Sequence, residues 1–62
     1  MNQYISSYYP NLIFSNVESA KDFAEKLEFE EYEVVEYIYL SDDEKQATHI
    51  GYAILKKGIL FQ

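Results

Sequence analysis

Apolar residues recur every three or four positions in one central segment of the chain, which is the spacing of a helix face turned toward a core. The residues that share this spacing are Val17, Ala20, Phe23, Ala24 and Leu27. Just before them, Ser15 and Glu18 match the S-x-x-E capping box, in which each side chain satisfies a free backbone N–H at the start of a helix. The pattern predicts a helix from about Asn16 to Leu27.

Residues 32–40 are rich in β-branched and aromatic side chains, a composition typical of a strand. Successive side chains of a strand point to opposite faces of the sheet. The face that we expect to pack against the helix carries Tyr32, Val34, Glu36, Ile38 and Leu40. The other face, which we expect to be an exposed surface of glutamates and tyrosines, carries Glu31, Glu33, Val35, Tyr37 and Tyr39.

The C-terminal third of the chain predicts a second strand and a hairpin. A polar connection over residues 41–46 leads into an alternating apolar segment over 49–55. Lys57-Gly58 is a turn signal, because glycine accepts the positive φ that tight hairpin turns require. Residues 59–61 could then return as a short final strand.

The N-terminal segment is less regular. Residues 4–9 fit either a strand or a short helix, and Pro10 ends this segment because the residue before proline avoids the helical region. Residues 12–14 then predict a short strand. The whole order predicts a single α+β domain over residues 1–62, with one helix packed on a small, mainly antiparallel sheet of three or four strands and a β-α-β-β core.

Charge narrows the range of partners. Eleven acidic residues face five lysines, there is no arginine, and the net charge is -6. Such a field repels phosphate backbones and anionic lipid headgroups, so we expect no direct nucleic acid binding and no membrane binding. A basic protein partner is favoured instead. Apolar runs reach only four residues, as in Tyr52–Leu55, and no charged leader precedes Lys21, so we expect a cytoplasmic protein.

The acidic residues are concentrated between Glu28 and Glu44, where eight carboxylates occur without a basic residue before Lys45. Residues two apart on a strand lie about 6.6 Å apart on one face. Glu31 and Glu33 could therefore form a row of charge beside Tyr37 and Tyr39, extended by Asp42, Asp43 and Glu44. Such a row could imitate DNA phosphates in a basic groove. The alternative is a solvated strand face whose charges only prevent edge-to-edge aggregation.

Catalytic and metal-binding groups are sparse. His49 is the only histidine, and no serine lies in a nucleophile-elbow context that would pair with it. The run Asp42-Asp43-Glu44 lacks the alternating spacing and central glycine of a calcium loop, and the chain has no cysteine. We therefore expect no enzyme activity, no cofactor and no metal site.

Two hypotheses follow. In the first, the chain binds and inhibits or regulates a basic protein, such as a nucleic-acid-processing or DNA-binding protein, through the surface formed by Glu31, Glu33, Tyr37, Tyr39, Asp42, Asp43 and Glu44. In the second, it is a structural or assembly module that forms a homodimer or joins a complex through its tyrosine-rich sheet face. A chain of 62 residues without disulfides often supplements its core by self-association.

Overall fold

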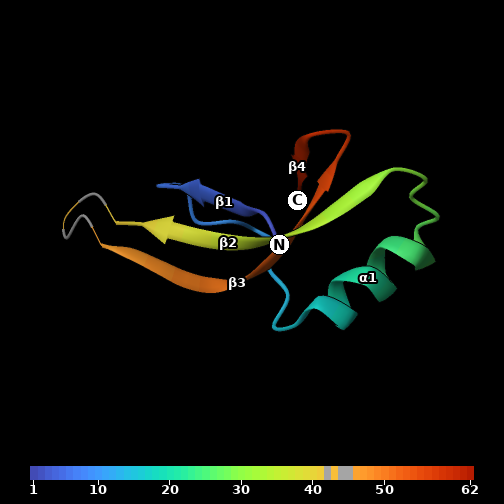
Figure 1. Ribbon diagram of the computed structural model, residues 1–62, viewed down its shortest axis with the longest axis horizontal. Helices are drawn as coiled ribbons and strands as arrows, with labels where there is room; N and C mark the ends of the chain where they lie inside the picture. Colours follow the sequence, from blue (N-terminus) through green and yellow to red (C-terminus); the bar gives the residue numbers. More distant parts are fainter. Residues whose placement is uncertain (42, 44–45) are drawn as a thin grey trace.

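The computed structural model describes residues 1–41, 43 and 46–62, and these residues form one helix and a four-stranded sheet (Figure 1). The elements are β1 Gln3–Ser6, α1 Val17–Lys26, β2 Tyr32–Leu40, β3 Ala47–Lys56 and β4 Ile59–Phe61. The strands lie in the order β1-β2-β3-β4, with β1 parallel to β2 and the other two pairs antiparallel. The predicted α+β fold is confirmed.

The two C-terminal hairpins follow the sequence pattern closely. β2 has the predicted bounds, and β3 extends the predicted strand at both ends. Lys57 and Gly58 join β3 to β4 with φ values of 54° and 81°. Positive φ at both central residues is the geometry of a type I′ turn, whose twist suits a two-residue hairpin loop.

The helix α1 begins one residue later than the capping box predicted. Asn16 is the N-cap, and its side-chain oxygen accepts a hydrogen bond of 2.8 Å from the backbone N–H of Ser19. The prediction of Ser15 as the cap is therefore wrong. Asn and Ser are comparably good N-caps, so the choice between neighbours depends on where the chain turns into the helix.

The main core lies between α1 and one face of β2 and β3. Ala20 and Ala24 are 0% exposed, and their small side chains let the helix approach Val34 and Ile54 of the sheet. Around them lie four half-buried phenylalanine rings, those of Phe14, Phe23, Phe29 and Phe61. The expected packing of the first β2 face against the helix is confirmed for the proximal half of the strand.

The opposite face of the sheet is covered by a strap, residues 7–13, that follows β1. Tyr37 is 0% exposed, and its hydroxyl donates a hydrogen bond to the backbone carbonyl of Tyr8. Pro10 is also buried, and Ile13 packs against the cluster around Tyr37. The expectation that Tyr37 is an exposed phenol is wrong, because a segment far away in sequence closes over it.

The strap ends at the outer edge of β3. The backbone N–H and C=O of Phe14 pair with those of Tyr52 at 2.8 Å each, so the predicted strand over 12–14 is reduced to one bridge. Gly51 permits this close approach, since a Cβ there would lie 2.6 Å from the Phe14 carbonyl oxygen and 2.8 Å from Ile13 Cγ1. Its φ of 151° also favours glycine.

Candidate functional site

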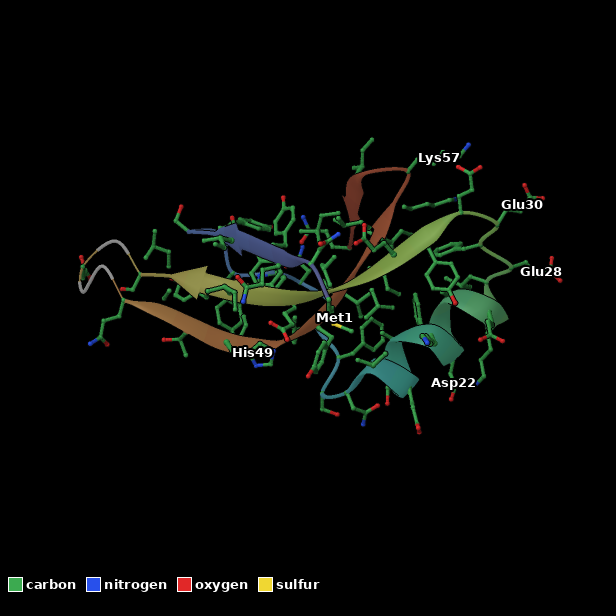
Figure 2. The ribbon with its side chains drawn as sticks, in the orientation of Figure 1. Met1, Asp22, Glu28, Glu30, His49 and Lys57 are labelled. Atoms are coloured by element: carbon green, nitrogen blue, oxygen red, sulfur yellow. The ribbon has the colours of Figure 1, made fainter. Side chains whose placement is uncertain are left out.

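The carboxylates gather at the end of the molecule where α1 passes into β2. We call Leu27–Glu31 the acidic end; it contains Glu28, Glu30 and Glu31, which are all exposed. Figure 2 shows Glu28 and Glu30 pointing away from the body at this end. Three negative groups therefore face solvent within four residues.

The way α1 ends fixes this geometry. The N–H of Glu28 donates to the Glu25 carbonyl and the N–H of Phe29 to the Ala24 carbonyl, both at 3.0 Å. This pair of bonds is a Schellman motif, which turns the chain sharply and satisfies two free carbonyls. Phe29 is directed back to the core, where its ring lies 5.0 Å from that of Phe61.

Glu28 is an unusual residue at its position. It follows the helix C-cap and has φ 60°, a left-handed conformation that glycine adopts far more readily. Its negative charge also lies at the negative end of the helix dipole. Both features reduce stability, so stability alone would favour another residue here.

A shallow hollow of about 230 Å³ adjoins the acidic end. It is lined by Leu27, Glu28, Phe29, Glu30, Glu31, Lys56 and Lys57. Lys56 Nζ lies 4.6 Å from the centre of the Phe29 ring, a cation–π contact. Lys56 and Lys57 are far from Glu31 along the sequence, but the pairing of Tyr32 with Lys56 brings both lysines to the acidic end.

Two further glutamates on β2 are bound by neutral amides. The side-chain amide of Asn2 donates to Glu33, and that of Gln3 donates to Glu36 at 3.3 Å. An amide donor orients a carboxylate without neutralising it. Glu33 is exposed and lies just beyond the acidic end, so it adds to the negative field there.

The structure does not bring the predicted site together. Glu31 and Glu33 lie at one end of β2, while exposed Asp43 lies in the β2–β3 connection at the other end of a body 38 Å long (Figure 1). Between them Tyr37 is buried, and half-buried Tyr39 packs edge-on against Tyr9 of the strap at 5.4 Å. Asp42 and Glu44 lie outside the described residues.

Glu28 and Glu30 belong to the acidic end although sequence reasoning left them out of the site. The predicted site was built from the alternating positions of a strand, and the strand begins only at Tyr32, after these two residues. The signal that could have found them was the run of acidic residues directly after the predicted helix end.

The contact that the structure gives His49 is with an aromatic ring. It is exposed on β3, and its ring packs edge-on against Tyr52 with 5.2 Å between ring centres. In residues 1–41, 43 and 46–62, no three His, Asp or Glu side chains are grouped as a metal site would require.

A comparison with known protein families, curated proteins and solved structures found no match for the chain. Its residues and their geometry therefore carry the functional argument. In the described part of the chain, the single helix α1 is too short and too polar to span a bilayer.

Proposed function

We propose that the chain is a small, non-enzymatic, cytoplasmic protein that binds a basic segment of another protein through its acidic end, and so inhibits or regulates that partner. The observation that carries this proposal is Glu28. A residue that destabilises both the backbone and the helix end is a reason to look for a role in binding, because such positions concentrate at functional sites.

The acidic end combines a negative electrostatic field with an apolar side chain that a partner could contact. Exposed carboxylates steer a cationic surface toward the protein and raise the association rate. Leu27, which is 49% exposed beside them, offers an apolar anchor. The hollow is smaller than the roughly 300–1,000 Å³ of usual small-molecule sites and has a mainly charged lining, which favours a macromolecular partner over a substrate.

Imitation of a DNA duplex receives less support than general recognition of a basic protein. A duplex as long as this 38 Å body would carry about 22 phosphate charges, from one charge per 1.7 Å of axis. The chain has a net charge of only -6. We therefore propose a local electrostatic contact at one end, with a nucleic-acid-processing or DNA-binding protein as the natural partner class.

The assembly hypothesis receives less support than binding of a basic protein. It needs an open tyrosine face, and the strap covers that face over Tyr37. Tyr8 and Tyr9 remain exposed on the strap itself, but they are not arranged on one strand.

A charge-neutral variant tests the proposal. Glu28→Gln, Glu30→Gln and Glu31→Gln together change the net charge from -6 to -3 (-6 + 3), and the side chains keep nearly the same size. The matched control makes the same charge change elsewhere, with Glu18→Gln, Asp22→Asn and Asp43→Asn. In Figure 2, Asp22 lies on the outer side of α1, away from the sheet.

The assay is affinity capture from a lysate of the native host with each protein immobilised. We expect the wild type and the control to retain the same basic protein, and the acidic-end variant to lose it. Raising salt from about 0.1 M to about 0.5 M should also release it, because screening shortens the Debye length. Retention of that partner by the acidic-end variant would refute the proposal.

A further inference from the structure

One aromatic ring borders the hollow at the acidic end. Phe29 is half-buried, and its ring packs edge-on against that of Phe61, with 5.0 Å between ring centres. It also lines the hollow of about 230 Å³, together with Glu28, Glu30 and Glu31. The core therefore holds the ring in place, while part of the ring is open to a group that enters the hollow.

A cation of the protein itself occupies this ring. Lys56 lies on the same side of β3 as Ile54 of the helix-side core, because side chains alternate along a strand. The Lys56 Nζ lies over the Phe29 ring, 4.6 Å from its centre. A cation within about 6 Å of a ring centre is attracted to the ring face. The Phe29 ring is therefore already a binding place for a positive charge.

The carboxylates around the ring are not neutralised by the two lysines of the hollow. In residues 1–41, 43 and 46–62, neither Lys56 nor Lys57 forms an ion pair with a carboxylate. Figure 2 shows Lys57 extending outward from the β3–β4 turn, with Glu28 and Glu30 at the same end of the molecule. A cation that enters the hollow therefore meets an aromatic face and nearby negative charges together.

An arginine side chain fits this combination better than a lysine does. Its guanidinium group is planar and weakly hydrated, so it stacks on an aromatic face while its N–H groups donate to carboxylates in pairs. The ammonium group of Lys56 is a compact, strongly hydrated charge, and Lys56 is exposed. An exposed contact between a lysine and a ring is weak, so a guanidinium group that also bonds to carboxylates can replace it.

We propose that the Phe29 ring holds an arginine side chain of the basic partner, and that Lys56 occupies the ring until this arginine displaces it; both statements rest on the proposed function, since the partner must bind at the acidic end. Lys56 is then an internal competitor that lowers the affinity for a basic segment and admits an arginine more readily than a lysine. The hollow is below the usual size of small-molecule sites, and a single side chain suits it.

The strength of the Lys56 contact sets the size of this effect. An arginine that needs the ring binds only those molecules in which Lys56 has left it, so the apparent affinity falls with the fraction of open rings. For an exposed cation–π contact this loss of affinity is about three- to sixfold. Removal of the Lys56 charge should restore this factor, in addition to the general gain from one more net negative charge.

Titration calorimetry with oligoarginine and oligolysine peptides of equal length tests the competition. Lys56→Gln removes the charge over the ring. Lys57→Gln is the matched control, since it makes the same change in net charge, from -6 to -7 (-6 - 1), in the lining of the same hollow. We expect Lys56→Gln to bind oligoarginine about three- to sixfold more tightly than Lys57→Gln does.

A second pair of variants tests the ring itself. Phe29→Leu should lower the ratio of oligoarginine affinity to oligolysine affinity about two- to fivefold, because both peptides keep the carboxylates and only the ring is lost. Phe61→Leu is its control, since Phe61 supports the Phe29 ring in the core but does not line the hollow. Thermal melts verify that each variant folds, and the two lysine variants decide the question should Phe29→Leu unfold.

The outcomes separate this inference from the proposed function. Equal binding of oligoarginine by Lys56→Gln and Lys57→Gln would overturn the competition, and so would an unchanged affinity ratio in folded Phe29→Leu. In both cases the proposed function stands if the neutral variant of Glu28, Glu30 and Glu31 still loses both peptides. A wild type that binds neither peptide would overturn the proposed function and the arginine site together.

Discussion

Replacing Gly51 by alanine tests how the strap is held against the sheet. The added Cβ would lie 2.6 Å from the Phe14 carbonyl oxygen, so either the strap or β3 must move. The φ of 151° adds strain for any L side chain. The substitution therefore acts on the crossing that closes the sheet over Tyr37.

The magnitude follows from three contributions. Backbone strain of this kind costs about 1–3 kcal/mol. The two Phe14–Tyr52 hydrogen bonds are worth about 1 kcal/mol each and would lengthen or break. The total is about 3–5 kcal/mol, against a whole stability of about 3–9 kcal/mol for a chain of 62 residues.

Gly58→Ala is the matched control. Gly58 also has positive φ, at 81°, but a Cβ there would meet nothing within 4 Å. It should therefore cost only the conformational strain, about 1 kcal/mol, or about 4–8 °C in melting temperature. Thermal unfolding followed by circular dichroism should show Gly51→Ala lower by at least about 12 °C or already unfolded. Equal and small losses for both variants would refute the close crossing of strap and sheet.

Three smaller changes test other parts of the structure by the same melts. Glu28→Gly should raise stability by about 1 kcal/mol, since it removes left-handed strain and a charge at the helix C-terminus; no gain would contradict this geometry. Asn16→Ala should lower stability by about 1 kcal/mol, whereas Ser15→Ala should change it by less than about 0.5 kcal/mol. A larger loss for Ser15→Ala than for Asn16→Ala would indicate that Ser15 is the N-cap. Tyr37→Phe should cost about 1 kcal/mol and Tyr39→Phe much less, because only the Tyr37 hydroxyl is bound by the strap; equal losses would argue against that bond.

Local signals predicted the helix and the hairpins well. The apolar spacing around Phe23 and the β-branched run through Val34 and Val35 each point to one secondary structure, and the Lys57-Gly58 turn is a two-residue signal. Such features depend on neighbours in sequence, so a single chain reveals them. The N-cap was missed by one residue, because Ser15 and Asn16 are both good caps and only the backbone path decides between them.

The candidate site depended on contacts that sequence spacing does not contain. Tyr37 is buried by a carbonyl 29 residues earlier in the chain, and strand alternation says nothing about a strap. The alternation of side chains along the strand placed Glu33 and Tyr39 on one face of the sheet. It did not show that β2 is long enough to put Asp43 at the far end of the body from Glu33. Lys56 and Lys57 lie at the acidic end because the β2–β3 register pairs Lys56 with Tyr32.

Titration of the ¹⁵N-labelled protein with an oligolysine peptide tests most directly whether the acidic end is the binding surface. We predict that amide shifts change first and most at Leu27–Glu31 and Glu33, that they return to their free values at about 0.5 M salt, and that the strap stays unaffected. Shifts centred on the outer face of α1, or spread evenly over all exposed carboxylates, would contradict a binding surface at the acidic end.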